Sequence, residues 1–192
     1  MQLLPGVARL VTHLASHGVP IAIATGSLRR NYELKTAHLQ HVFARFGEHV
    51  VCATDDSAGR GKPFPDVFLA AARALGRPVG PNEDDGTAGV GEAEHAERAR
   101  GLVFEDAIPG VQAGKRAGMS GVLFYFQSCA CLVLTSGVWA VVWVPDENLL
   151  SVGNSQTNVE PPDQTLRSLE DFVPEEWGLP PFFTKNQSET NT

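Results

Sequence analysis

The sequence has few residues from which a cross-linked or thiolate-bound framework could be built. Cysteine occurs three times among the 192 residues, at Cys52, Cys129 and Cys131. An odd number of cysteines without a Cys-x-x-Cys spacing argues against a disulfide scaffold and a thiolate zinc site. The six histidines are scattered and form no His-Glu-x-x-His motif. A zinc enzyme is therefore a poor interpretation of this chain.

Positive charge is scarce as well. The chain has 15 Lys and Arg against 22 Asp and Glu, a net charge of −7 at pH 7. No basic cluster could neutralise phosphates along a nucleic acid, so we expect no nucleic-acid partner. The first residues carry neither a basic region nor a long apolar run, which are the marks of a secretory signal. We therefore expect a reducing, cytoplasmic location.

What the chain does have is an alternation of helical and extended patterns. At 43% hydrophobic residues it can bury the core of a single domain. Alternating helices and strands predict an α/β fold with right-handed crossovers and a mainly parallel sheet. From their apolar spacing and turn residues we predict helices at about 5–17, 28–46, 66–75 and 109–117, and strands at 21–24, 49–53 and 101–104.

Three regions depart from this alternation. Residues 77–100 are rich in glycine and acidic residues and predict a flexible surface insertion. Residues 119–145 contain no charged residue, which suits a membrane span, but polar residues dilute the run. We expect a buried strand at 140–144 preceded by an apolar insertion at 120–139, with a membrane span as the alternative. Residues 180–192 are expected to form a disordered tail.

Polar residues suited to phosphate chemistry lie where predicted strands end or in a loop between them. Thr25 and Gly26 follow the first strand, Lys62 stands in a loop rich in Gly and Pro, and Glu105 and Asp106 follow a later strand. The carboxyl ends of parallel strands meet at one edge of a sheet, where the chemistry of such folds lies. Hydroxyl, amide and ammonium groups can hold phosphoryl oxygens, and carboxylates can hold Mg²⁺. The simpler readings are a turn, a surface lysine and helix capping by the acids.

The order of these motifs is more specific than any one of them. Three runs follow one another along the chain: Ile-Ala-Ile-Ala-Thr-Gly-Ser, then Gly-Lys-Pro-Phe-Pro-Asp-Val-Phe, then Val-Phe-Glu-Asp-Ala-Ile-Pro-Gly-Val-Gln-Ala-Gly. In this order they resemble the haloacid dehalogenase (HAD) superfamily, within it the pseudouridine-5′-phosphatase and β-phosphoglucomutase-like subgroup. The resemblance implies a Rossmann-like α/β core within residues 1–179. It also implies hydrolysis of a phosphate monoester of a small metabolite, a sugar phosphate or a nucleoside 5′-phosphate such as pseudouridine 5′-phosphate, with Mg²⁺.

The resemblance also implies roles for single residues. Thr25, with the Gly26 amide, is similar to the motif that holds a phosphoryl oxygen, and Lys62 resembles the lysine that bridges nucleophile and phosphoryl group. Asp106 resembles the magnesium ligand, and Glu105 its neighbour that acts through water. We interpret Asp66, which begins the next predicted helix, as a helix cap.

The chain departs from the family pattern at the nucleophile. The first strand of the family carries an Asp-x-Asp pair, which supplies nucleophile and acid/base, and a helical cap follows it. This chain contains no Asp-x-Asp. We therefore expect an N-terminally truncated core that lacks the first strand and the cap and is inactive as a phosphatase. The alternative is a non-catalytic pseudoenzyme or interaction remnant.

The missing strand also carries a structural expectation, because in the family it is central in the sheet. Its loss predicts unpaired edges on both neighbouring strands. We further expect residues 122–139 to form an exposed apolar segment that promotes aggregation.

Overall fold

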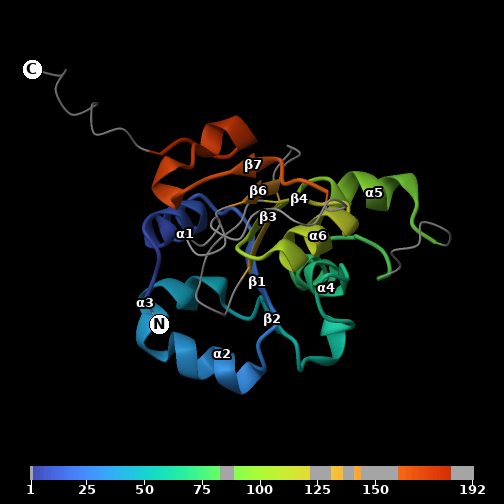
Figure 1. Ribbon diagram of the computed structural model, residues 1–192, viewed down its shortest axis with the longest axis horizontal. Coiled ribbons are helices and arrows are strands. Elements are labelled where there is room, and N and C mark those ends of the chain that lie inside the picture. Colours follow the sequence, from blue (N-terminus) through green and yellow to red (C-terminus); the bar gives the residue numbers. More distant parts are fainter. Residues whose placement is uncertain (1, 83–88, 122–130, 136–140, 144–159, 183–192) are drawn as a thin grey trace, which may run out of the picture.

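A computed structural model of the chain describes residues 2–82, 89–121, 131–135, 141–143 and 160–182. Its strands form one seven-stranded sheet in the order β2-β1-β5-β3-β6-β7, with β4 also paired to β3 (Figure 1). Their bounds are β1 Ile21–Thr25, β2 Val50–Cys52, β3 Gly101–Glu105, β4 Ser120–Gly121, β5 Cys131–Thr135, β6 Val141–Trp143 and β7 Gln164–Thr165. All pairs except those of β5 are parallel. The predicted α/β fold with a mainly parallel sheet is confirmed.

Three of the four predicted helices are shorter in the structure, and the last has its predicted length but begins one residue earlier. The α-helices are α1 Val7–Ser16, α2 Arg29–Thr36, α3 Gln40–Phe43, α4 Asp66–Ala74, α5 Glu92–Arg98 and α6 Ile108–Arg116. Short 3₁₀ helices are η1 Ala37–Leu39, η2 Ala44–Phe46, η3 Asp56–Ala58, η4 Leu169–Asp171 and η5 Pro174–Trp177. Helix α5 was not predicted; it lies within the 77–100 region, of which residues 83–88 are outside the described part.

The single helix predicted for 28–46 is instead α2, η1, α3 and η2 in succession. Where α2 meets η1, side chains donate hydrogen bonds to backbone carbonyl groups. The Thr36 hydroxyl donates to the Tyr32 carbonyl at 3.0 Å, and the Gln40 amide donates to the Thr36 carbonyl at 3.1 Å. Such local bonds compete with the backbone bonds of a continuous helix, so the apolar spacing alone overestimated its length.

The sheet is covered on both faces, and the alternation of side chains along its strands explains how. Ile21 and Ile23 of β1 belong to one apolar cluster, and Ala22 and Ala24 belong to the other. Successive strand residues point to opposite faces, so each strand contributes to both layers. Helix α1 and the η4–η5 segment cover the first face, while α4 and α6 cover the second (Figure 1).

Strand β5 overturns the expectation of unpaired edges. It lies antiparallel between β1 and β3, with Val133 opposite both Ala22 and Val103. The edges of β1 and β3 that were expected to be open are thus paired, and residues 131–135 form a central strand of the sheet. The run Cys-Leu-Val-Leu-Thr is apolar and free of charge, which suits a strand with neighbours on both sides. The rest of the segment that was expected to be exposed and apolar, residues 122–130 and 136–139, lies outside the described part of the chain.

The strand predicted at 140–144 is present as β6. Within the described residues, no helix is long and apolar enough to cross a membrane. Most of the segment that carried the membrane-span alternative, and residues 183–192 of the expected tail, lie outside the described part of the chain.

Candidate active site

The structure brings Lys62 and Glu105 together at the carboxyl edge of the sheet. Glu105 is the last residue of β3, and Lys62 lies in the loop that leads into α4. The Lys62 Nζ forms an ion pair with Glu105 Oε1 and donates to the Ala24 carbonyl of β1 at 3.4 Å. Lys62 therefore links the ends of β1 and β3. Its contact on β1, Ala24, is the residue before Thr25.

Lys62 is not a surface lysine. Its side chain is 18% exposed, and its Nζ lies 4.9 Å from the ring centroid of Phe68 on α4. Because most of the side chain is buried, its charge is screened less by water than that of an exposed lysine. Lys62 can therefore act as a strong point charge for an anion at this edge.

Glu105 has two roles at once. Its side chain is only 2% exposed. Oε1 faces Lys62, while Oε2 accepts from the amides of Asp106 at 3.1 Å and Ala107 at 3.3 Å. The carboxylate thus accepts from two backbone amides just before α6 and also pairs with the ammonium group of Lys62. A cation on Oε1 would lie beside the Lys62 charge, so this carboxylate is a poor direct ligand for Mg²⁺.

Gly110 makes room for this carboxylate, a function that the sequence analysis did not assign. A Cβ atom at Gly110 would lie 1.8 Å from Glu105 Cδ and 2.1 Å from Oε2. The first turn of α6 therefore rests directly on the Glu105 carboxyl group. A glycine five residues after the acid was the available signal in the sequence.

Gly110→Ala should destabilise the protein, whereas Gly114→Ala on the same helix should not. The first methyl group must displace a buried, hydrogen-bonded carboxylate, at a cost of about 1–3 kcal/mol or more. At Gly114 the nearest atom to a new Cβ is 3.5 Å away, an ordinary contact, and alanine favours the helix by about 1 kcal/mol. Urea denaturation followed by circular dichroism measures both. Equal stability of the two variants would contradict the packing of α6 on Glu105.

Thr25 and Gly26 end β1 beside Lys62. Thr25 is 2% exposed, and its Oγ1 accepts from the Ser27 amide at 3.1 Å. This is the turn interaction of the simpler reading, but a hydroxyl that accepts one bond keeps its own hydrogen for donation. Gly26 is exposed, and a Cβ built on it meets nothing within 4 Å. The backbone here is thus open to a ligand.

Asp106 is the remaining candidate for a metal. It is partly exposed and lies two residues before the start of α6. Among the described residues, no group of three or more His, Cys, Asp or Glu side chains could hold a metal ion. Magnesium in phosphoryl-transfer sites takes one or two carboxylates and completes its shell with water and phosphate oxygens. Asp106 alone fits such a shared shell, but not a site made of protein ligands only.

A cavity of about 510 Å³ lies away from this edge, between α2 and the segment leading into β2. Its lining includes Arg29, Tyr32 and Glu48 and none of the candidate site residues. The chemistry suggested by the strand ends is therefore not located in this cavity.

Comparison with known proteins agrees with the geometry. A sequence profile of haloacid dehalogenase-like hydrolases matches residues 1–118. The chain belongs to this family. The matched range contains Thr25, Lys62, Glu105 and Asp106, and it ends before β4 and β5. The antiparallel strand β5 is thus outside the part that matches the HAD profile.

Curated relatives and solved structures are similar over most of this HAD chain. A protein of Arabidopsis thaliana named (DL)-glycerol-3-phosphatase 2 is 38% identical over 185 residues, covering 96% of this chain and 60% of the relative. A Drosophila melanogaster protein named "Probable pseudouridine-5′-phosphatase" is 36% identical over 181 residues, covering 94% and 60%. The chain thus spans about 60% of the length of these relatives.

Among solved structures, a HAD family hydrolase from Deinococcus radiodurans with bound phosphate and sodium has a TM-score of 0.55 at 25% identity. The match covers 92% of this chain and 61% of that one. A family IA HAD hydrolase from Entamoeba histolytica has a TM-score of 0.56 at 20% identity, covering 92% and 59%. This second likeness supports the HAD fold alone.

Proposed function

We propose that the chain is the phosphate-binding part of a HAD phosphatase whose substrate is a phosphate monoester of a small metabolite. The observation that carries the proposal is the Lys62 ammonium, held in a largely buried position beside the end of β1. Relatives named for glycerol 3-phosphate and for pseudouridine 5′-phosphate support a substrate of this size and chemistry. A sugar phosphate or a nucleoside 5′-phosphate belongs to the same class.

The residues of this chain would bind and neutralise the phosphoryl group. Lys62 balances the charge of one oxygen, while the Thr25 hydroxyl and the Gly26 amide donate to others. Glu105 keeps Lys62 in place through its ion pair. Asp106 would hold Mg²⁺, which when bound neutralises charge on the phosphate oxygens. Nucleophilic attack needs a further group, since the sequence contains no Asp-x-Asp.

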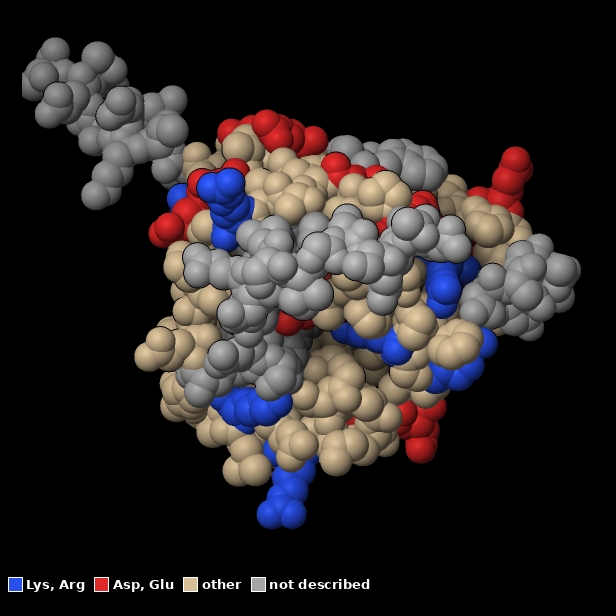
Figure 2. Space-filling view, in the orientation of Figure 1, with Lys and Arg blue, Asp and Glu red and all other residues tan. Residues whose placement is uncertain are grey.

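The charge distribution suits a small anion held at one point. On the face in Figure 2, basic side chains form separate groups, not one continuous stripe. Acidic residues of η4 and η5, namely Glu170, Asp171, Glu175 and Glu176, add negative charge near α1. This face therefore lacks the continuous basic stripe expected of a protein that follows a nucleic-acid backbone. A cytoplasmic location stays a prediction.

A non-catalytic role is the second candidate. It is favoured by the lack of an Asp-x-Asp pair together with the occupation of the space between β1 and β3 by β5. The first candidate requires the chain to bind phosphate at Lys62 and to turn over substrate when a nucleophile is supplied. The second candidate requires neither.

Titration calorimetry with inorganic phosphate tests the binding site. Lys62→Gln should weaken binding about 10- to 100-fold, the equivalent of one charge-assisted hydrogen bond of 1.5–3 kcal/mol. Lys115→Gln is the matched control, because Lys115 is 16% exposed and paired with Asp163 at 2.7 Å. It should bind as the wild type does. Equal affinity of the Lys62 variant and the wild type would rule out the proposed site.

A further inference from the structure

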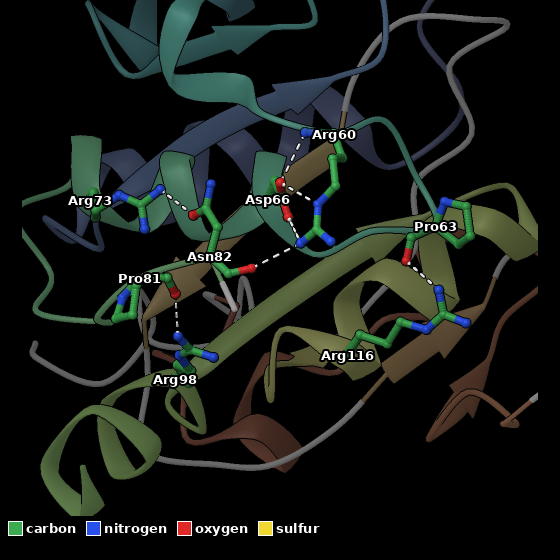
Figure 3. Close-up of polar contacts among 8 residues, drawn as sticks. All are labelled: Arg60, Pro63, Asp66, Arg73, Pro81, Asn82, Arg98 and Arg116. Atoms are coloured by element: carbon green, nitrogen blue, oxygen red, sulfur yellow. Dashed lines mark hydrogen bonds and ion pairs between the residues drawn. The ribbon is translucent and has the colours of Figure 1, made fainter. Parts of the chain in front are cut away.

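The Asp66 carboxylate holds Arg60 by three hydrogen bonds (Figure 3). The Arg60 amide and Nε donate to Oδ2 at 2.9 and 3.0 Å, and Nη2 donates to Oδ1 at 2.9 Å. Asp66 is 3% exposed; burial raises the pKa of its carboxyl group, but the bonds from Arg60 outweigh this and the pKa is lowered overall. The interpretation of Asp66 as a helix cap is thus corrected: its carboxylate is held chiefly by the loop before the helix.

The loop from Gly59 to Asp66 is closed around this carboxylate. A Cβ atom at Gly59 would lie 2.5 Å from Asp66 Oδ2, and the φ angle of Gly59 is +62°. The Arg60 guanidinium lies over the ring of Phe64, 4.3 Å from its centroid. Residues near both ends of the loop therefore contact the same ion pair, and Lys62 stands between them.

Two further contacts hold the same loop. Arg116, the last residue of α6, donates through Nη1 to the Pro63 carbonyl at 3.0 Å (Figure 3). Arg60 Nη2 also donates to the Asn82 carbonyl at 3.1 Å, and Arg73 binds the Asn82 side chain at 2.5 Å. Hydrogen bonds thus hold the backbone at Arg60, two residues before Lys62, and at Pro63, one residue after it.

We propose that Asp66 is a positioning residue for Lys62, acting through Arg60, and that Arg116 supports the same loop through Pro63. The inference rests on the proposed function, because the position of Lys62 matters only if its ammonium group binds an anion. A loop fixed in advance loses less conformational entropy when the anion binds. Asp66 would therefore increase phosphate affinity without touching phosphate.

A purely structural role predicts a different result. If Asp66 only stabilised the fold, its replacement would lower the melting temperature but leave the phosphate affinity of the folded protein unchanged. If it positions Lys62, the affinity of the folded protein must fall, and the backbone amides within 59–64, other than at Pro63, must exchange faster with deuterium. The two measurements separate the roles.

The test compares Asp66→Asn and Arg116→Gln with the wild type at a temperature where circular dichroism shows each variant to be folded. Phosphate binding to Asp66→Asn should weaken about tenfold, the lower end of what loss of a group that orients a ligand typically costs. Hydrogen exchange at 59–64 should accelerate while α1 stays unchanged. If Asp66→Asn does not fold, the exposed Arg116 variant gives the same test, with a smaller expected loss.

Two glycines provide a matched pair. Gly59 has φ 62° and ψ −137°, and Gly47 has φ 54° and ψ −126°, so alanine meets nearly the same backbone strain at both. A Cβ at Gly47 meets nothing within 4 Å, whereas at Gly59 it would strike Asp66. Gly59→Ala should therefore reduce phosphate affinity as Asp66→Asn does, and Gly47→Ala should not.

The outcomes distinguish this inference from the proposed function. If wild type binds phosphate, Lys62→Gln does not, and Asp66→Asn binds like wild type, the positioning role is overturned and the proposed function stands. If wild type fails to bind phosphate at all, the proposed function fails and the positioning role fails with it. Unchanged exchange at 59–64 in Asp66→Asn also contradicts the positioning role.

Discussion

Val133→Pro is expected to unfold the protein or to lower its free energy of unfolding by about 3 kcal/mol or more. Val133 lies in β5 with Ala22 on one side and Val103 on the other. Proline removes the amide hydrogen that the central strand donates to a neighbour, and it is not tolerated in the middle of a sheet. Because domains are stable by only about 5–15 kcal/mol, this loss is large. Urea denaturation followed by circular dichroism measures it.

Glu92→Pro is the control for this substitution. Glu92 is the exposed first residue of α5, where proline is well accommodated, and the preceding Gly91 has the extended conformation that proline requires, with φ −80° and ψ 174°. This variant should retain the stability of the wild type. A Val133 variant equally stable would mean that residues 131–135 do not pair with both β1 and β3.

The chain by itself is expected to hydrolyse p-nitrophenyl phosphate about 10⁴- to 10⁶-fold more slowly than a phosphatase with its full set of catalytic groups. The reason is the missing Asp-x-Asp pair, since loss of a nucleophile alone costs about this factor. The phosphate site proposed at Lys62 does not depend on that pair, so we expect binding and turnover to be separated in this chain. Steady-state release of p-nitrophenolate by the purified protein gives the rate.

Lys62→Ala identifies the source of any turnover that is observed. A contaminating phosphatase would give the same rate in the wild-type and variant preparations. Turnover in the ordinary enzymatic range of about 1–10³ s⁻¹ that is lost in Lys62→Ala would show that the chain contains another nucleophile. The expectation of an inactive chain and the non-catalytic alternative would then both be wrong.

Strands β1, β2 and β3 could be predicted from the sequence to within about two residues. Each is a short apolar run next to turn residues, and this signal is contained in the run itself. The positions of Thr25 and Glu105 at strand ends followed from the same local patterns. The order of the three HAD motifs added the family, because it is also a property of the linear chain.

Only the tertiary structure showed how these residues are used. Lys62 pairs with Glu105, which lies 43 residues further along the chain. Position 110 requires glycine because the Glu105 carboxyl group lies against it. The Asp66 carboxylate binds Arg60 in the preceding loop and does not cap the helix that Asp66 begins. Contacts of this kind depend on how separate elements pack, and no local periodicity carries that information.

The clearest case is β5. The sequence determined that residues 131–135 are apolar and uncharged, but they were predicted to lie in an exposed insertion and no strand was predicted there. It did not determine the partners, the direction or the register. Those were decided by the two parallel strands β1 and β3, whose facing edges both needed hydrogen-bond partners. A strand satisfies an open edge in either direction, so pairing is a property of the assembled sheet and not of the segment.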